Sequence, residues 1–304
     1  MLKISKNFNP SENFNLVNND AFCVFADIPT GYADHVITDP PYNISGYDNK
    51  KEIGWVKSNK YWTDDKKFTK IEENWDKFSD SDYDKFTELW LNEIFRIVKP
   101  NGNIMIFGTY HNIYKIGALL QKYDKKIINS ITWFKRNAFP NITQRMLCES
   151  TEYVIWAVNN NQKKAKNWTF NYNKLKDINI IKICKKCKRN VEQRYAYCGN
   201  CGNTDFSVKK TQMRNLWDIP STPTNERKYG KHPSQKPVEV IERLVTGMTN
   251  ENDIIIDPFM GSGTVPLVAK SLNRKFIGID NDENYCELAR KRIINDHKQE
   301  KLSI

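Results

Sequence analysis

The chain has 304 residues, of which 39% are hydrophobic, so it is long enough for one large domain with a small inserted module. It carries 47 lysine and arginine residues against 36 aspartate and glutamate residues, and this net charge of +11 suits a polyanionic partner. A run of 18 apolar residues and a signal-peptide stretch are both missing, which argues against a membrane span and predicts a cytoplasmic protein with reduced cysteines.

The first part of the chain predicts alternating strands and helices. Strands are expected at 14–17, 35–38, 103–107, 127–134 and 152–158, and helices at 20–25, 80–98 and 111–122. Ser79 and Asp82 have the spacing of a capping box at the start of the second helix. The polar segment 43–78 is too long for a simple connection, which indicates a functional lid or a mobile loop.

The middle of the chain is richer in lysine and asparagine, and we interpret it as an inserted module. Regular structure is expected to resume with a helix at Pro237, a strand at 253–256, a helix at 264–272, a strand at 275–279 and a helix at 282–297. This alternation predicts an α/β fold with a parallel, doubly wound sheet. The expected divisions are 1–158 for the first half of the main domain, 159–231 for the insert and 232–304 for the second half.

A tetrapeptide, Asp39-Pro40-Pro41-Tyr42, follows the expected strand 35–38. Its two prolines fix two φ angles and remove two backbone donors, so the turn is stiff. The carboxylate at one end of the turn can accept hydrogen bonds from a planar amino group. The aromatic ring at the other end can stack on the heterocycle that bears this group. These properties suit methylation of an exocyclic base nitrogen; the alternative is an ordinary proline-containing loop.

A second turn, from Asp257 to Thr264, joins an expected strand to an expected helix. Gly261 and Gly263 let the backbone approach a ligand closely, and the helix that follows offers free amide groups. Pro266 stands where the dinucleotide fingerprint G-x-G-x-x-G would have its third glycine, so the turn does not match that fingerprint. Asp280 follows the turn by about 20 residues, at a position where an acid can bind ribose hydroxyls. The combination fits S-adenosylmethionine (SAM); the alternative is a purely structural turn.

The two motifs together resemble those of the amino-group DNA methyltransferases, and the likeness covers residues 14–158 and 232–297. The resemblance implies a Rossmann-like, mostly parallel sheet with one reversed strand. Because the catalytic motif precedes the SAM motif, the chain is similar to the β group, whose target-recognition region lies between the two halves. The insert 159–231 matches no motif of the family, so the recognised DNA sequence stays open.

The resemblance also implies which residues hold SAM. The segment 232–237, His-Pro-Ser-Gln-Lys-Pro, resembles one that touches SAM, and Asn19-Asp20-Ala21 resembles one near the SAM adenine. Phe259, Gly261 and Gly263 match the cofactor turn of the family. The implied cofactor-binding residues are Asp20, Asp39, Ser234, Lys236, Asp257, Phe259, Gly261, Ser262, Gly263, Thr264 and Asp280.

For the reaction, the resemblance implies direct methyl transfer to a base flipped out of double-stranded DNA. Asp39, Pro40, Pro41 and Tyr42 would be catalytic, with the carboxylate of Asp39 and the carbonyl of Pro40 each accepting one N–H of the amino group. Aspartate at the first position is commoner in the adenine N6 enzymes, so we expect adenine, with cytosine N4 as the alternative. A non-catalytic nucleic-acid-binding subunit is a second alternative, which the two intact motifs disfavour.

Four cysteines of the insert form two Cys-x-x-Cys pairs, Cys184 with Cys187 and Cys198 with Cys201. This spacing predicts a structural four-thiolate zinc site, with a metal-free or an iron–sulfur cluster as alternatives. The lysines around the first pair are expected to lower the thiol pKa values. DNA contact, a purely structural role and docking of a restriction subunit are all open for this module, and a homodimer is a further expected partner. The isolated Cys23, Cys148 and Cys286 are expected to be buried.

Overall fold

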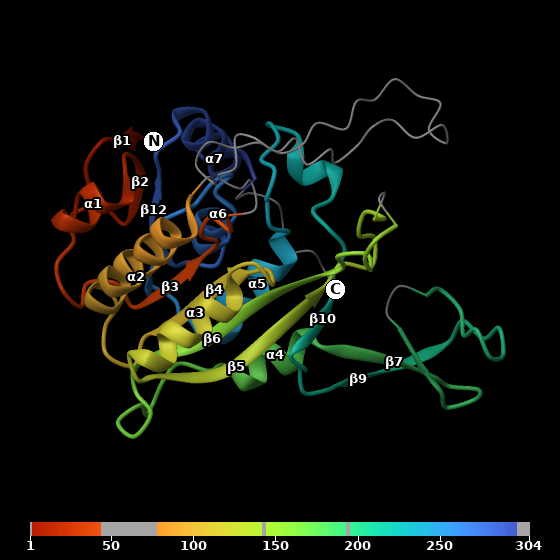
Figure 1. Cartoon of the computed structure of the whole chain (residues 1–304). Helices are drawn as coiled ribbons and strands as arrows, with labels where there is room; N and C mark the ends of the chain where they lie inside the picture. Colours follow the sequence, from red (N-terminus) through yellow and green to blue (C-terminus); the bar gives the residue numbers. More distant parts are fainter. Residues whose placement is uncertain (1, 44–77, 142–143, 193–194, 297–304) are drawn as a thin grey trace.

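The computed structural model describes residues 2–43, 78–141, 144–192 and 195–296 (Figure 1). Nearly all of the predicted lid therefore lies outside the described residues. A nine-stranded sheet forms the centre, in the order β1-β2-β12-β11-β3-β4-β6-β5-β10. Its strands are β1 (Ile4–Ser5), β2 (Phe14–Asn18), β3 (His35–Thr38), β4 (Asn103–Gly108), β5 (Lys125–Phe134), β6 (Thr151–Asn161), β10 (Leu216–Asp218), β11 (Ile254–Asp257) and β12 (Lys275–Asp280).

Only one strand of this sheet runs against the others among the described residues. β6 is antiparallel to both of its neighbours, β4 and β5, whereas the remaining pairs are parallel. The expected α/β, mostly parallel Rossmann-like fold with one reversed strand is confirmed. Because the strands β12, β11, β3 and β4 are parallel, their carboxyl ends lie along one edge, where such folds place their ligands.

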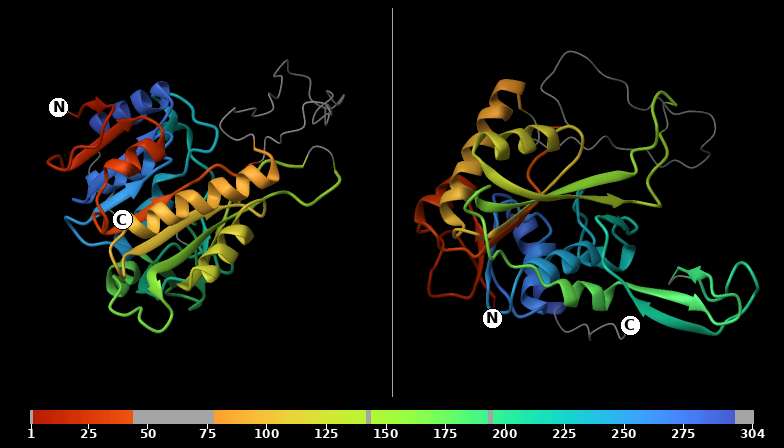
Figure 2. Two further views of the ribbon diagram at one scale, coloured as in Figure 1. Left: turned by 60° about the vertical axis from the view of Figure 1, so that its left-hand side comes forward. Right: turned by 90° about the horizontal axis from the view of Figure 1, so that it is seen from below.

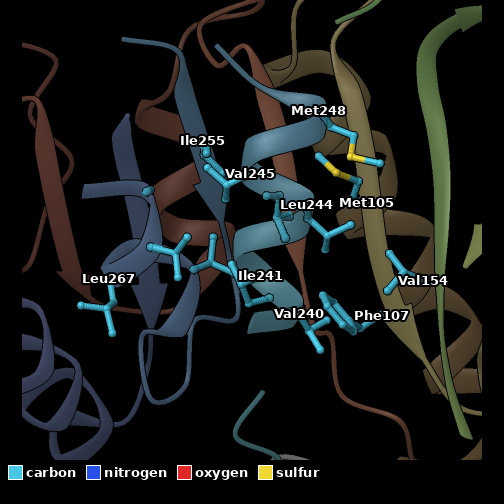
Figure 3. Close-up of a cluster of buried hydrophobic side chains, with 14 of the residues drawn as sticks. Met105, Phe107, Val154, Val240, Ile241, Leu244, Val245, Met248, Ile255 and Leu267 are labelled. Carbon is cyan, nitrogen blue, oxygen red and sulfur yellow. The ribbon is translucent and has the colours of Figure 1, made fainter. Parts of the chain in front are cut away.

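Helices cover both faces of the sheet. On one face, α1 (Ala21–Asp27), α2 (Asp80–Ile97) and α3 (Ile113–Lys122) bury their apolar residues against the strands. On the other face lie α4 (Tyr172–Ile178), α5 (Val238–Met248), α6 (Thr264–Ser271) and α7 (Glu283–Asn295). Figure 3 shows the side chains of α5 packed between Ile255 of β11 and Met105 and Phe107 of β4.

Local signals in the sequence set several of these boundaries. Ser79 caps α2 as the spacing predicted, since its side chain accepts a hydrogen bond from the backbone N–H of Asp82. Pro237 is the N-cap residue of α5, where a missing backbone donor costs nothing. The short helix α1 begins after Asp20, whose side chain accepts a hydrogen bond from the N–H of Phe22. No described helix is both long and apolar enough to cross a membrane.

The range 159–231 has two structural parts. Leu175 of α4 is buried in the main core, and β10 pairs in parallel with β5, so both ends of this range are built into the main domain. Between them, β7 (Ile180–Cys184), β8 (Asn190–Val191) and β9 (Phe206–Lys210) form a separate three-stranded sheet. This part, residues 180–210 as described, is called the arm below; it projects from the main body in Figures 1 and 2.

The base of the arm is closed by Asn179 and Thr211. The backbone N–H of Thr211 donates to the carbonyl of Asn179 at 2.9 Å, and the Asn179 side chain donates to the carbonyl and hydroxyl of Thr211 at 3.1 and 3.0 Å. It also reaches the carbonyl of Gln212 at 3.0 Å. The two ends of the arm are thereby tied together at the point where it leaves the main body.

Candidate active site

The two motifs meet because they follow adjacent strands. β3 and β11 are paired in parallel, so the turns after Thr38 and Asp257 leave the sheet side by side. The hydroxyl of Thr38 donates to Asp257 Oδ1 at 2.9 Å and links the two strand ends directly. A cavity of about 610 Å³ opens over both turns and over the end of β12. This volume is within the range of pockets that hold a cofactor or a drug-sized ligand.

The first motif forms one wall of the cavity, and Asp39, Pro40, Pro41 and Tyr42 all line it. The Tyr42 hydroxyl donates to Asp39 Oδ1, and the hydroxyl of Tyr83 in α2 donates to the carbonyl of Pro41 at 2.7 Å. Burial, offset in part by the charge of Lys236, raises the pKa of Asp39. Burial followed by the neighbouring Asp39 charge holds the pKa of Tyr42 well above its usual value, so Tyr42 stays neutral.

The second motif forms the opposite wall. Asp257, Phe259, Gly261, Ser262 and Thr264 line the cavity together with residues of the first motif. Gly261 has a positive φ of 48°, and a β-carbon built on it would lie 2.7 Å from Nε2 of His232. The turn therefore requires glycine at this position. Burial raises the pKa of Asp257 to about 8, so this carboxyl is mostly protonated at neutral pH.

Gly263 packs closely against α7. It has a φ of 72° and is the N-cap residue of α6, and it is missing from the described cavity lining. A β-carbon at Gly263 would lie 2.5 Å from that of Ala289 in α7. This glycine therefore permits close packing of the turn on α7, and its contact with the cofactor stays a prediction.

The remaining predicted cofactor residues come from distant parts of the chain. Asp20, at the start of α1, and Asp280, at the end of β12, both line the cavity. Asp280 Oδ2 accepts a hydrogen bond from the N–H of Gly261 at 2.9 Å, which ties it to the second motif. Burial raises the pKa of Asp280 to about 6. Ser234 also lines the cavity, on the segment that precedes α5.

Lys236 lies between the two motifs. Its side chain is 6% exposed, and its ammonium lies 2.5 Å from Asp39 Oδ2 and 3.1 Å from the carbonyl of Ser234. Its own carbonyl accepts a hydrogen bond from the hydroxyl of Thr264 at 3.1 Å. Burial lowers the pKa of this ammonium, but the carboxylates of Asp39 and Glu152 more than offset that effect and raise it. Lys236 is therefore a buried cation held by the first motif.

Two cavity residues, Glu152 and Lys135, are missing from the sequence-based assignment. Glu152 is the second residue of β6, and its Oε1 accepts a hydrogen bond from Lys135 at 3.1 Å. Its Oε2 lies 3.3 Å from the ammonium of Lys236. Burial would raise the pKa of Glu152, but Lys236 and Lys135 together lower it. Neither residue belongs to a motif; the only signal was an opposite charge at the end of one expected strand and at the start of the next.

The four paired cysteines meet at one end of the arm. The Sγ atoms of Cys184, Cys187, Cys198 and Cys201 all lie within 4.8 Å of one another, and Cys184 is 3.5 Å from Cys201. Four sulfurs around a tetrahedral zinc ion are separated by about 3.8 Å, given a Zn–S distance of about 2.3 Å. The donor set and its spacing therefore fit zinc.

The two cysteine turns have the same backbone form. Each ends in a residue with positive φ, Lys188 at 60° and Gly202 at 67°, whose N–H donates to the carbonyl of the first cysteine of its pair. A hydrogen bond from the N–H of Cys187 is the main cause that lowers the pKa of Cys184 to about 6. The backbone, rather than the expected lysine side chains, favours the thiolate here. Of the isolated cysteines, Cys286 is buried as expected, but Cys23 and Cys148 are exposed, so that expectation was wrong for both.

Comparisons with known proteins agree with this geometry. The model of a family of DNA methylases of the N6/N4 class matches residues 33–291. The type II methyltransferase M2.LlaDCHI of Lactococcus lactis subsp. cremoris is 35% identical, covering 95% of this chain and 93% of its own length. M2.DpnII of Streptococcus pneumoniae is 34% identical, covering 91% of this chain and 88% of its own length.

A solved structure has a similar fold. The M1.HpyAVI–SAM complex is 28% identical, with a TM-score of 0.56, and the match covers 91% of this chain and 96% of that one. Similarity extends over nearly the whole length of both chains, including both motifs and the sheet that brings them together. This chain belongs to the family of N6/N4 DNA methylases.

Proposed function

We propose that this DNA methyltransferase transfers a methyl group from SAM to the N6 atom of adenine within a specific sequence of double-stranded DNA. One observation carries the proposal: the turns after β3 and β11 share a single cavity. A base amino group held by the first turn would therefore face a cofactor held by the second. The solved M1.HpyAVI structure, which contains SAM, supports the cofactor.

The residues of the second wall suit SAM. Asp280 offers a carboxylate for ribose hydroxyls, and Asp20 stands near the expected position of the adenine ring. The glycine at 261 keeps the backbone free of a side chain, while Phe259, Ser262 and Thr264 complete that wall. When bound, SAM supplies a methyl group already activated on a sulfonium sulfur. The protein therefore has to orient the acceptor, and no covalent nucleophile is needed.

The first wall suits a flipped base. No described residue donates to the carbonyl of Pro40, so this oxygen is free to accept one N–H of the amino group. Asp39 would accept the other N–H, and the Tyr42 ring would stack on the base. The nitrogen lone pair then points at the methyl group: the N–C bond forms as the S–C bond breaks, the bonding pair stays on sulfur, and the nitrogen later loses a proton to water. The negative Asp39 favours the positive charge that develops on nitrogen.

Adenine is favoured over cytosine by Asp39 itself, because an aspartate at the first position of this motif is commoner among the adenine enzymes. The fold does not discriminate between them, since a cytosine-N4-specific methyltransferase, PvuII, shares it at 16% identity and a TM-score of 0.59. Cytosine N4 is therefore the second candidate. A non-catalytic subunit is disfavoured, because both walls of the cavity carry the groups that the reaction needs.

The experiment is transfer of labelled methyl groups from SAM to unmethylated genomic DNA, followed by digestion and mass spectrometry of the nucleosides. Labelled N6-methyldeoxyadenosine is the expected product, and sequencing then identifies the recognised site. N4-methyldeoxycytidine would establish the second candidate. With Asp39→Ala we expect less than about 10% of the wild-type rate, in line with losses of two or more orders of magnitude for comparable groups. An active Asp39→Ala variant would refute the role of Asp39.

We also propose that the arm binds zinc and contacts the DNA. Lys186, Lys188, Arg189 and Lys209 lie on the arm with no acidic partner among the described residues. The arm projects away from the main body (Figures 1 and 2). A zinc-bound arm that carries free cations suits the phosphate backbone of the duplex.

This contact is tested by the salt dependence of DNA binding. Replacing Lys186, Lys188, Arg189 and Lys209 with glutamine should reduce the slope of log affinity against log salt by about 0.9 for each phosphate that these cations neutralise in the wild type. Lys185 and Lys210 are matched controls on the same arm, because they already pair with Asp205 and Asp177. An unchanged slope for the fourfold variant would mean that the arm does not touch DNA. The names of the relatives support a restriction–modification role, while a restriction subunit and a homodimer stay predictions.

A further inference from the structure

Both oxygens of Asp39, the carboxylate proposed to accept the base amino group, already have partners. Tyr42 donates to Asp39 Oδ1, and the Lys236 ammonium lies 2.5 Å from Oδ2. A cation so close to Asp39 opposes the positive charge that develops on the attacking nitrogen. The reaction therefore gains if the ammonium moves away from Asp39 when the base arrives.

Glu152 offers the ammonium another position. Its Oε2 is buried and accepts no hydrogen bond of acceptable geometry from any described residue, although it lies only 3.3 Å from Nζ of Lys236. A charge-assisted N–H···O bond is about 2.7–2.9 Å long, so a shift of about 0.5 Å would complete it. The other oxygen, Oε1, is fixed by Lys135, which holds the Glu152 side chain in place.

The surroundings of Lys236 favour this short exchange. Its side chain is 6% exposed, and the ammonium lies 5.5 Å from the ring centroids of both Tyr42 and Phe107. These aromatic faces and the carbonyl of Ser234 keep the cation in the cavity wall. Within that wall, Asp39 and Glu152 are the two described carboxylates within ion-pair distance of it.

We propose that Glu152 is a positioning residue for methyl transfer: it takes over the ammonium of Lys236 when the base amino group binds Asp39. This inference rests on the proposed function of the same cavity. In the base-free enzyme, Lys236 neutralises Asp39. In the base-bound enzyme, Lys236 pairs with Glu152, and Asp39 is left with its full negative charge toward the amino group.

The first test is Glu152→Gln in the full-length protein, assayed by single-turnover methyl transfer to the DNA identified above. The rate should fall roughly 10- to 100-fold, whereas the dissociation constants for SAM and DNA should change less than about twofold, because the effect lies in the transition state. Glu88→Gln is the matched control: Glu88 also pairs with a lysine, Lys122, but lies outside the cavity lining. An unchanged rate in Glu152→Gln would overturn the proposal.

The second test separates positioning from a structural role. In a Lys236→Met background, Glu152→Gln should alter the rate less than about twofold, because the cation it would receive is gone. A full additional loss would overturn the proposal. Should Glu152→Gln fail to fold, Glu152→Asp, which keeps the charge on a shorter stem, is compared in the same two backgrounds, and an effect of equal size in both would overturn it.

The pH–rate profile gives a signature that a structural role would not produce. Asp39 faces Lys236, Glu152 and Tyr42, and its charge also acts on the nearby Asp257. The negative Glu152 raises the pKa of Asp39, so Glu152→Gln should move the acid limb of the profile to lower pH while lowering the plateau. An acid limb that moves to higher pH would contradict the proposal. A wild-type protein that methylates no DNA would refute the proposed function and this inference together, whereas an active wild type with an equally active Glu152→Gln variant would refute only the inference.

Discussion

The guanidinium of Arg292, on the last helix α7, donates from Nη1 to the carbonyl oxygen of Ser262 at 2.7 Å. The same atom lies 3.0 Å from the Ser262 hydroxyl and 2.9 Å from the hydroxyl of Thr264. Arg292 is 1% exposed, so these contacts are made in the interior. The buried guanidinium of Arg292 thus supports the turn of the second motif, although Arg292 lies 30 residues after Ser262 in the sequence.

We expect Arg292→Met to weaken both the fold and the cofactor site. Loss of buried hydrogen bonds to a charged donor should lower the free energy of unfolding by about 2–3 kcal/mol. The affinity for SAM should fall about tenfold or more, since the turn loses its support. Chemical denaturation and titration calorimetry measure the two effects. Arg290→Met is the control on the same helix, because Arg290 pairs only with the exposed Glu287 among described residues; equal SAM affinity in both variants would contradict the assigned role.

Gly261→Val should abolish SAM binding. Its β-carbon would lie 2.7 Å from Nε2 of His232, and a φ of 48° is strained for a β-branched residue, so either the turn or the His232 ring in the cavity wall must move. Calorimetry should detect no SAM binding at concentrations that saturate the wild type. Gly31→Val separates the two causes: φ is 66° there, but no atom lies within 4 Å of the added β-carbon. That variant should lose stability and keep its SAM affinity; the reverse pattern would refute the steric argument.

SAM affinity should rise with pH through the titration of Asp280. Burial raises the pKa of this carboxyl to about 6, and its ionised form is the stronger acceptor for ribose hydroxyls. Fold stability should respond in the opposite sense. Because the folded state binds the proton more tightly than the unfolded state, ionising Asp280 lowers stability as pH rises from about 4 to about 6.

Calorimetric titrations between about pH 5 and about pH 7 cover the window in which Asp280 ionises. The SAM dissociation constant should fall across it in the wild type and stay nearly constant in Asp280→Asn. His232 and Asp257 titrate outside this window, since burial lowers the pKa of His232 to about 4 and raises that of Asp257 to about 8. An equally steep profile in Asp280→Asn would show that another group is responsible.

Metal analysis should find about one zinc ion per chain, bound by the four sulfur atoms of the arm. Cys184→Ser combined with Cys198→Ser removes one ligand from each pair and should release the metal completely. Cys23→Ser combined with Cys148→Ser is the matched control, because both residues are exposed and isolated from the cluster. Zinc retained by the first double variant, or released from the second, would argue against the assigned site.

The sequence predicts the parts of the fold and site that depend on short stretches of chain. Helix and strand periodicity predicts the alternating order, and turn chemistry at Asp39–Tyr42 and at Gly261 predicts the two walls of the cavity. Such features are local, because φ restrictions and side-chain periodicity act over a few residues.

The features of the fold and site that the sequence does not predict depend on contacts between residues that are distant in the chain. Glu152 reaches the cavity because the reversed strand β6 brings its first residues to the carboxyl ends of its neighbours, and Lys135 follows one of those ends, that of β5. β10 has three residues and no periodicity to reveal it, and its pairing with β5 places it in the sheet. The packing of Gly263 also escaped the sequence, because a glycine does not show which neighbour it admits; that neighbour is Ala289.

The hydrogen bonds between Asn179 and Thr211 have a consequence for how such an enzyme could acquire a new DNA site. They close the arm at its base, so the chain leaves and re-enters the main body at one point. A segment whose two ends lie close together can be lengthened, shortened or exchanged without changing the strand order of the main sheet, because the hydrogen bonds at its base keep the ends together. If the arm contacts DNA as proposed, replacing the segment between these two residues with another could alter which DNA is recognised and leave the active site unchanged.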